Sequence, residues 1–518
     1  MRKLIFVLLA IAIIVVVALN SFSDKTYHPE QIVSLKEKFS EKPPKIVDHS
    51  KFAVLQKKFK TPQEVTKTCI SCHTERHKEV MATSHWQWER PDYIARKGIV
   101  YLGKRNIINN FCIGVQTSVK SCAKCHIGYD MKEDGSSYKK PENVDCLVCH
   151  DNSNTYVKGP NMAGNPAPSV DLTKVAQSVG RTSRDNCGVC HFYGGGGNAV
   201  KHGDLDNSMF HPDRKIDVHM DEAGPNLVCS DCHKTENHVI AGRLYSIATT
   251  NTKRAACEDC HTSTPHAESI LNEHTVKVAC QTCHIPIYSK ERSTNLYWDW
   301  STAGELRDGK PFMEEDSLGN HIYKSIKGSF TYGRKLVPDY VWFNGTADHY
   351  LLGDEVQDTT KPVVLNPLHG SYADGKIIPV KIHITNQPFD PVTKLIIQPH
   401  LYADKKGEGA YWKDFDWNAA NKSGMEAIGL PYSGKYTFIK TKMYWPLNHQ
   451  VSPEDEALKC TDCHTRENSR LAGLTDFYMP GRDANPWVDN LGVLILLLTL
   501  VGVLGHGALR IYFTRKQK

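Results

Sequence analysis

Long hydrophobic runs are scarce in this sequence and occur only near its two ends. The mean hydropathy is −0.43 and charged residues make up 23% of the chain, values typical of a water-soluble globular protein. They exclude a membrane protein that crosses the bilayer many times. Cysteine outside a motif is also scarce: of 17 cysteines, Cys112 alone stands apart from a recurring pattern.

The other cysteines form eight Cys-x-x-Cys-His motifs. In this motif two thiols bond covalently to a haem, and the adjacent His becomes an axial ligand of its iron. Zinc sites or a disulfide framework would not require a His after every second Cys. The sequence therefore predicts eight covalently bound haem c groups. The attachment residues are Cys69, Cys72, Cys122, Cys125, Cys146, Cys149, Cys187, Cys190, Cys229, Cys232, Cys257, Cys260, Cys280, Cys283, Cys460 and Cys463. The proximal histidines are His73, His126, His150, His191, His233, His261, His284 and His464.

Eight haems in 518 residues leave about 65 residues per haem, too few for a large side-chain core at each site. We therefore expect a multihaem cytochrome c that is mostly α-helical and irregular, with porphyrins filling much of its interior. The formal net charge of +6 is offset by the haem propionates. Nothing in this balance favours nucleic acid as a partner.

The haem motifs are unevenly distributed. Seven lie within residues 65–284 at irregular intervals, which argues against a tandem repeat. Residues 285–459 have no motif but many aromatic and turn residues, with β-like runs at 376–384 and 394–398. We expect a partly β covering segment there, not an independent domain. Residues 460–486 carry the eighth haem and complete the cytochrome.

The two ends predict targeting and anchoring. Residues 1–23 have the pattern of a signal peptide or signal anchor, with cleavage left open, and 24–64 form a linker and N-terminal approach. The apolar run 491–509 would span roughly 28 Å as a helix, close to the bilayer core. A basic tail follows it. We therefore predict a transmembrane helix within 487–518, with the haem body on the periplasmic, extracytoplasmic face of the cytoplasmic membrane.

Each low-spin haem needs a second axial ligand, usually a His. The chain has 25 histidines, so 17 remain besides the eight proximal ones. Seven of these, close to the motifs, are the predicted distal ligands: His85, His202, His219, His238, His266, His274 and His449. Seven ligands for eight irons leave one haem able to bind substrate. His369 and His383 are the alternatives for an eighth ligand.

Several stretches are more specific than the haem motifs. They are 82–90 (Ala-Thr-Ser-His-Trp-Gln-Trp-Glu-Arg), Asn109–Cys112, Asn143–Asp151, 194–206 with its four glycines, and Asp217–Met220. On these the sequence resembles the octahaem tetrathionate reductase family of periplasmic cytochromes, over roughly residues 65–480. That family is similar in haem arrangement to pentahaem nitrite reductases and hydroxylamine oxidoreductases.

The resemblance implies that the second haem, held by Cys122, Cys125 and His126, is catalytic and has a Lys on its distal side. We assign that Lys to Lys201, beside the glycine-rich turn; Lys158 is the alternative. The family also places a Cys near this haem, which we match to Cys112. Such a thiol exchanges with sulfur compounds or bonds an iron-bound substrate, or it is a buried apolar residue.

The sequence departs from the family at Asn198, where an acid is expected three residues before the Lys. An amide forms hydrogen bonds but cannot relay protons, and Asp204 or Asp151 could substitute. The C-terminal helix is a second departure and implies a membrane electron source or sink.

Three functions follow. The first is a reductase in which electrons from a membrane quinol pathway reach the second haem through bis-His haems, and tetrathionate, nitrite or hydroxylamine is reduced. The second is an electron conduit without catalysis, which needs an eighth distal His. The third is an oxidase similar to hydroxylamine oxidoreductase.

Overall fold

The computed structural model describes residues 47–94, 97–242 and 253–516. The predicted signal segment and the first part of the predicted linker, residues 24–46, lie outside the described residues. The chain divides into two compact units, with the boundary between Ala457 and Leu458. Seven haem motifs and the haem-free segment belong to the first unit, whereas the eighth motif and the C-terminal helix belong to the second.

The helices of the first unit are short, and six of the twelve α-helices in its described residues overlap a haem motif. Helix α3 shows the pattern: the Thr61 side chain accepts a hydrogen bond from Glu64 N, Pro62 starts the helix, and Cys72 ends it. The helices are α3 (Pro62–Cys72), α4 (Arg76–Met81), α5 (Ser84–Gln87), α6 (Val119–Cys122), α7 (Leu147–His150), α8 (Leu172–Gln177), α9 (Arg184–His191), α10 (Cys229–Cys232), α11 (Ser269–His274), α12 (Cys280–His284), α13 (Tyr411–Asp414) and α14 (Trp417–Ala427). The 3₁₀ turns η1 (His49–Lys51), η3 (Ala123–Cys125) and η8 (Cys257–Asp259) carry further site residues.

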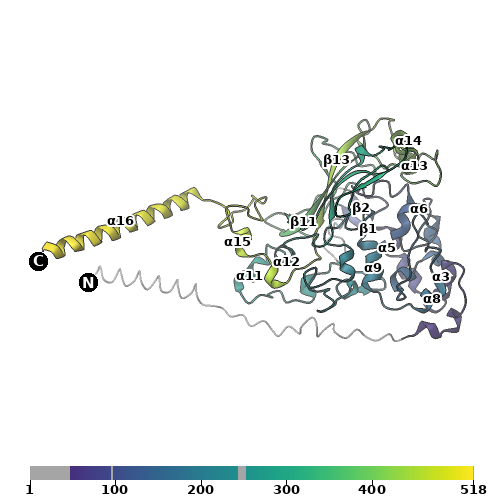
Figure 1. Ribbon diagram of the computed structural model, residues 1–518, viewed down its shortest axis with the longest axis horizontal. Coiled ribbons are helices and arrows are strands. Elements are labelled where there is room, and N and C mark those ends of the chain that lie inside the picture. The colour runs from purple at the N-terminus through teal and green to yellow at the C-terminus, as the bar shows by residue number, and fades with distance from the viewer. Residues whose placement is uncertain (1–46, 95–96, 243–252, 517–518) are drawn as a thin grey trace. The chain divides into compact units, whose positions relative to one another are not determined.

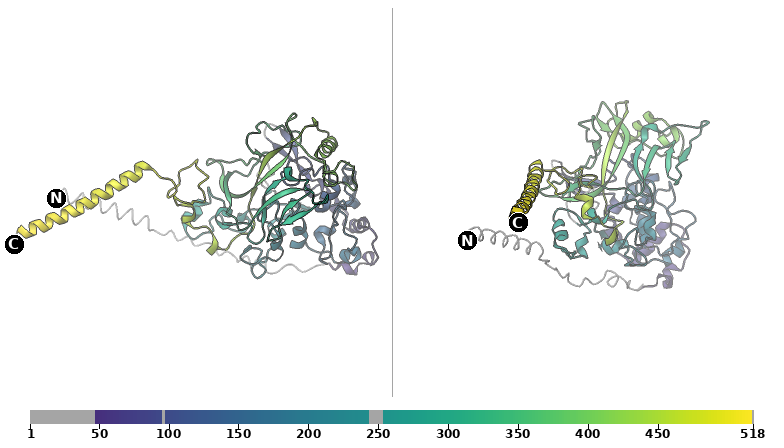
Figure 2. Two further views of the ribbon diagram at one scale, coloured as in Figure 1. Left: turned by 45° about the horizontal axis from the view of Figure 1, so that its top comes forward. Right: turned by 60° about the vertical axis from the view of Figure 1, so that its left-hand side comes forward.

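The haem-free segment forms a nine-stranded sheet. Its strands are β5 (Thr294–Asp299), β6 (Met313–Glu315), β7 (His321–Lys324), β8 (Gly328–Gly333), β9 (Asp339–Phe343), β10 (Val363–Val364), β11 (Lys376–Asp390), β12 (Leu395–Ile396) and β13 (Thr437–Pro446). The order is β10-β13-β11-β5-β8-β7-β6, and β9 and β12 also pair with β11. Strands β11 and β13 are antiparallel and lie side by side in Figure 1. Figure 2 shows the same sheet, in teal to green, from two further directions.

Two small hairpins complete the β-structure. They are β1 (Glu89–Ile94) with β2 (Gly98–Gly103), and β3 (Thr235–Glu236) with β4 (Val239–Ile240). The first hairpin leads into the Asn109–Cys112 stretch. It therefore connects the segment that carries His85 to the segment that carries Cys112, near the predicted site.

The largest side-chain core packs against the sheet, where no haem is attached. Trp298, Trp300, Tyr411 and Trp417 are buried there among aliphatic residues. The seven-haem region has smaller side-chain clusters, and one of them groups Trp88, Val119 and Met131 around the second motif. This distribution agrees with a multihaem cytochrome fold in which haems supply apolar contacts that the side chains do not.

The second unit contains α15 (Cys460–Cys463), with the eighth motif, and α16 (Pro486–Lys516). Helix α16 has 31 residues, and its apolar side chains are exposed along its length. In length and composition it is able to cross a membrane. It coincides with the helix predicted within residues 487–518.

Candidate functional site

The haem motifs lie on single helical turns. In α10, α12 and α15 the two cysteines stand three residues apart on the helix, so both thiols point to the same side. The His follows at or just beyond the last turn. This local geometry presents two thiols and one imidazole to the same neighbouring space, as covalent attachment of a haem requires.

Five proximal histidines each face a second histidine ring at nearly constant spacing. The ring centres are 6.4 Å apart for His49 and His73, 6.1 Å for His85 and His191, 6.0 Å for His219 and His261, 6.3 Å for His233 and His449, and 6.1 Å for His266 and His284. An iron between two imidazoles needs about 2.0 Å to each nitrogen and about 1.1 Å from nitrogen to ring centre, roughly 6.2 Å in all. These histidines therefore fit bis-His haems.

The ring nitrogens support the same fit. Nδ1 of His150 donates to Gly180 O at 2.9 Å, that of His233 to Ala241 O at 3.0 Å, and that of His464 to Pro480 O at 2.7 Å. A carbonyl oxygen only accepts, so the proton is on Nδ1 and the lone pair of Nε2 is left for a metal. His449 Nδ1 lies 3.1 Å from the buried Asp204 carboxylate, which orients that ring in the same way.

Of the seven predicted distal histidines, His85, His219, His266 and His449 face a proximal His. His238 lies near His150 and acts on it electrostatically, while its Nδ1 bonds Glu79 Oε2 at 2.8 Å. His274 bonds Ile270 O through Nδ1 at 2.6 Å.

His202 faces no proximal His within the described residues. Its ring instead lies edge-on to Trp445, 5.2 Å away. Conversely, the sequence analysis missed His49, which faces His73. The only indication in the sequence was the position of His49 upstream of the first motif, in a segment that we interpreted as a linker.

Cysteines from different motifs meet, which fixes the neighbours of several haem sites. The thiols of Cys69 and Cys146, of Cys125 and Cys190, of Cys187 and Cys229, and of Cys257 and Cys280 lie close enough to interact in pairs. The first site therefore adjoins the third, the second adjoins the fourth, the fourth adjoins the fifth, and the sixth adjoins the seventh. The second site is thus joined to the paired-histidine sites through the fourth.

The second site differs from these pairs. The His126 ring is buried among Trp86, Trp88 and Tyr138, at ring distances of 5.5, 4.9 and 5.4 Å. No second histidine ring within the described part of the chain faces it. Its Nε2 lies 2.5 Å from Trp86 O, so iron binding requires this imidazole to rotate. Burial lowers the pKa of His126 to about 3 and keeps the ring neutral, as a metal ligand must be.

Lys201 follows a turn that only glycine accommodates easily. Gly195 and Gly196 have φ of +86° and +93°, and a Cβ on Gly195 would lie 2.9 Å from Val200. The Lys201 ammonium lies 4.8 Å from the Trp445 ring and 5.8 Å from the Phe111 ring. Desolvation lowers the pKa of Lys201 to about 7, helped by Lys104, so a neutral amine is accessible near neutral pH.

The backbone of Lys201 rests on a second buried lysine. Lys381, on β11, is fully buried and donates from Nζ to Val200 O at 2.7 Å, Thr294 Oγ1 at 2.6 Å and Lys201 O at 3.3 Å. The haem-free sheet thus holds the segment that carries Lys201.

Cys112 lies where the two regions meet. It packs against the sheet core and also against the cluster that contains Cys122. Its amide donates to Asn109 Oδ1 at 2.8 Å. Burial raises the pKa of the Cys112 thiol, opposed by Lys104, Lys327 and Lys201. The side chain is therefore a protonated thiol beside the second haem motif.

Asn198 and the two carboxylates that could substitute for an acid there are engaged in other hydrogen bonds. The Asn198 amide is held by Asn207, donating to its Oδ1 at 3.2 Å and accepting from its backbone N at 2.9 Å. Asp204 binds His449, and Asp151 accepts from Ser153 N at 2.8 Å. None of the three carries a hydrogen bond to Lys201 within the described residues.

Lys158 is occupied as well. Its ammonium lies 3.0 Å from Asp145 Oδ2 and donates to His126 O, and both side chains are buried. Tyr129 and Tyr156 donate to the same carboxylate, each at 2.8 Å. Lys158 therefore secures the backbone of His126 and has no free ammonium for the metal.

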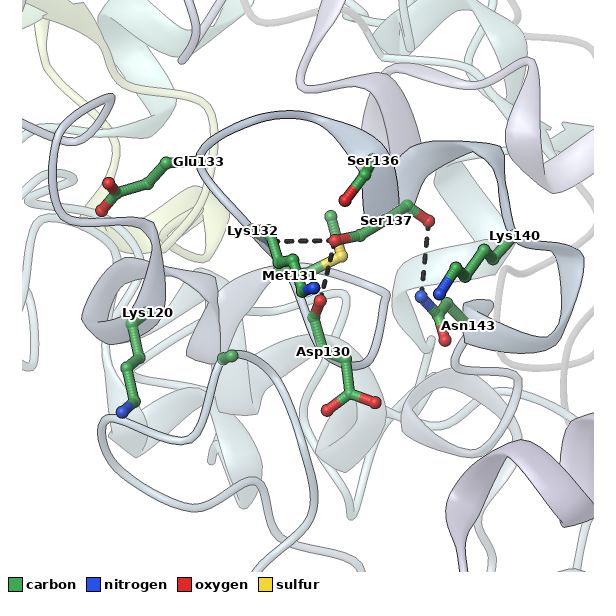
Figure 3. Close-up of a pocket in the computed structure, with 10 residues that line it drawn as sticks. Lys120, Asp130, Met131, Lys132, Glu133, Ser136, Ser137, Lys140 and Asn143 are labelled. Atoms are coloured by element: carbon green, nitrogen blue, oxygen red, sulfur yellow. Dashed lines mark hydrogen bonds between the residues drawn. The ribbon is translucent and has the colours of Figure 1, made fainter. Parts of the chain in front are cut away.

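A cavity of about 500 Å³ lies in the loop after the second motif, lined by Lys120, Asp130, Met131, Lys132, Glu133, Ser136, Ser137, Lys140, Asn143 and Ala163. Figure 3 shows Ser137 bonded to Lys132 N, Asp130 O and the Asn143 amide. Neither Lys201 nor Cys112 lines this cavity. The candidate site is therefore elsewhere, between the glycine turn and the sheet.

Motif turns, paired imidazoles and a mixed helical and β fold define a multihaem c-type cytochrome that binds haem covalently. Residues 295–467 match the family model described as bacterial cytochrome c. The structure is similar to the octahaem cytochrome c of Shewanella oneidensis, with a TM-score of 0.75 and 43% sequence identity, over 82% of this chain and 95% of that one. An uncharacterised protein of Archaeoglobus fulgidus is 28% identical over 247 residues, which are 38% of this chain and 80% of that protein.

This chain belongs to the octahaem cytochrome c family of the Shewanella structure, the octahaem tetrathionate reductase family that the sequence resembles. Membership establishes a multihaem redox protein with covalent haem c.

Proposed function

We propose that the protein is a membrane-anchored, periplasmic octahaem reductase of a small sulfur or nitrogen compound, with Lys201 as the distal ligand of the second haem. The observation that carries this proposal is the contrast at His126. Five other proximal histidines face a second imidazole at about 6 Å, and His150 lies near His238. His126 is instead enclosed by three aromatic rings and faces no second histidine ring within the described residues. This contrast supports a role for the second haem that differs from that of a bis-His electron carrier.

The bound haem would supply an iron that accepts electrons from its neighbours and holds the substrate. The surrounding residues would orient the substrate and exclude water. Lys201 offers an amine that exists in both protonation states near neutral pH, because desolvation lowers its pKa to about 7. Cys112 offers a thiol proton, and His202 stands next to Lys201 in the sequence. These three replace the carboxylate that Asn198 does not provide.

The contacts of the alternative ligands argue against a pure electron conduit. Both ring nitrogens of His383 are hydrogen-bonded, Nδ1 to Asn110 at 3.0 Å and Nε2 to Asn295 at 3.2 Å. His369 is exposed and bonds Thr346 through Nδ1 at 3.1 Å. A conduit with eight bis-His haems would have to break the buried His383 contacts, at a cost of about 1–3 kcal/mol for each unsatisfied group.

For two of the remaining distal positions we propose His49 on the first haem and His238 on the third. His202 then has no iron to bind and becomes a site residue beside Lys201. We further propose that α16 anchors the protein to the membrane and that electrons come from a quinol-oxidising membrane partner. The length and composition of α16 and its basic end support this arrangement.

The experiment is anaerobic reoxidation of the dithionite-reduced holoprotein, followed in the haem absorption bands. Nitrite, tetrathionate and hydroxylamine are added separately. We expect at least one to reoxidise all the haems with saturation kinetics, and Lys201→Met to alter that rate. If none does, while hydroxylamine reduces the oxidised protein, the oxidase replaces the reductase.

A further inference from the structure

Three lysines lie close enough to the Cys112 thiol to act on it electrostatically, and they come from three separate parts of the fold. Lys104 follows β2, Lys201 follows the glycine turn, and Lys327 stands in the turn between β7 and β8. All three act electrostatically on the thiol. Lys104 and Lys327 act on the Cys122 thiol too. Positive charge therefore gathers at the second haem motif.

The placement of Lys327 ties it to the segment that carries Lys201. Its carbonyl accepts a hydrogen bond from Trp298 Nε1 at 2.7 Å, which fixes the turn. Its ammonium lies 5.5 Å from the rings of Trp298 and Trp412. A Cβ on Gly196 would lie 3.6 Å from this ammonium, so the glycine turn passes directly beside it.

The three ammonium groups face aromatic rings instead of carboxylates. Lys104 lies 5.1 Å from the Trp88 ring, and Lys201 lies 4.8 Å from the Trp445 ring. Within the described residues none of the three has an ion pair or a hydrogen-bond acceptor for its Nζ. Lys104 is exposed, so its ammonium reaches solvent, whereas Lys201 and Lys327 are partly buried. Aromatic faces stabilise a cation but leave the N–H donors of these two lysines without an acceptor in the described residues. A small anion at this place would accept those donors.

We propose that Lys327, together with Lys104, recognises an anionic substrate at the second haem site. An amine bound to iron is neutral, so the positive charge must come from these two lysines once Lys201 is a ligand. These two lysines therefore favour a small inorganic anion such as nitrite, whereas neutral hydroxylamine would bind independently of their charge. This inference rests on the proposed function and narrows its substrate.

The test is an optical difference titration of the oxidised, full-length holoprotein with nitrite and, separately, with hydroxylamine. Lys327→Gln removes the charge and keeps a similar side-chain length. Lys327→Arg keeps the charge. Lys324→Gln is the matched control, because Lys324 lies three residues away on β7 and is not among the groups with the largest effect on Cys112 or Cys122. Haem content is measured for each variant first.

We expect Lys327→Gln to weaken nitrite binding roughly tenfold and to leave hydroxylamine binding within about twofold, since a lost charge acts on an anion and not on a neutral ligand. Lys327→Arg should bind nitrite nearly as the parent does, and Lys324→Gln should resemble the parent. If Lys327→Gln binds nitrite as tightly as the parent does, the inference is overturned. This holds even if the spectrum of the protein without ligand shifts, since such a shift would mean that the lysine binds a haem propionate.

The inference is also overturned if Lys327→Gln weakens the binding of nitrite and of hydroxylamine equally. In these outcomes the parent still binds both ligands and the proposed function stands. A parent protein that responds to neither ligand removes the proposed function, and the inference with it.

Discussion

His85 and His191 face each other with ring centres 6.1 Å apart, while the next residue, Trp86, directs its carbonyl at His126. One short helix, α5, therefore contributes to two haem sites at once. His85 lies beside the proximal His of the fourth motif, and Trp86 lies beside that of the second. This arrangement places the candidate catalytic site next to an electron-carrying one, as the contact between Cys125 and Cys190 also indicates.

Replacing His49 should affect the first haem alone. Its ring faces His73 at 6.4 Å, so His49→Ala should leave one iron with a single His. We expect a high-spin ferric EPR signal from about one haem in eight. His369→Ala is the control, since His369 is exposed and faces Thr346. An unchanged spectrum in His49→Ala would show that another residue binds the first iron.

Lys158 should contribute to the folding stability of the protein and should not bind the iron of the second haem. Its ammonium pairs with Asp145, and the side chains are 4% and 0% exposed. Lys158→Met leaves a buried carboxylate unpaired and should cost about 3–5 kcal/mol of unfolding free energy, measured by denaturant titration at equal haem content.

The control for Lys158→Met is Lys120→Met. The Lys120 and Asp404 side chains are 46% and 54% exposed, so the loss of this ion pair should cost less than about 1 kcal/mol of unfolding free energy. Equal losses in the two variants would contradict a structural role for the buried pair. So would a change in the spectrum of the second haem in Lys158→Met without loss of stability.

The spectrum of the second haem should depend on pH. The ligand form of Lys201 is the neutral amine, which predominates above its pKa of about 7. Iron competes with the proton, so the midpoint should lie below 7, with ligation lost as the pH falls. A pH titration of the EPR signal checks this, and Lys201→Met should abolish the transition. A transition that persists in the variant belongs to another group.

Removing α16 should release the protein from membranes. A chain that ends at Asn485 lacks the apolar helix but keeps α15 and the eighth motif. We expect the full chain to sediment with membranes after a high-salt wash and the shortened chain to remain in the supernatant with the same haem content. Retention of the shortened chain on membranes would assign the anchor to another part of the protein.

The sequence predicted the haem chemistry more completely than it predicted the spatial arrangement of the haem sites. The motifs are local, and a helical turn of four residues positions two thiols regardless of context. The pairing of His233 with His449 is not local: β13 must bring His449 back to a motif near the middle of the chain. Spacing along the chain cannot reveal such partners. For this reason His49, whose ring faces His73, was not among the predicted ligands, whereas His202, whose ring faces Trp445, was.

The length of the longest strand of the sheet was also underestimated, for a different reason. The expected strand ended at residue 384, but β11 continues to Asp390. Its second half buries polar residues, so the hydrophobic alternation stops. Gln387 is fully buried and accepts from Thr441 Oγ1 at 3.0 Å, while Pro388 lowers the expectation of a strand. Tertiary hydrogen bonds to Asn110 and β13 make this polar stretch stable in the sheet.

The most direct test of the central claim is low-temperature EPR of the oxidised holoprotein and its Lys201→Met variant, with and without nitrite and hydroxylamine. We expect about one haem in eight to differ from the bis-His signals, a ligand to perturb this haem alone, and the substitution to change only its signal. Eight bis-His signals that ignore both ligands and the substitution would contradict the central claim, and would leave a membrane-anchored electron carrier.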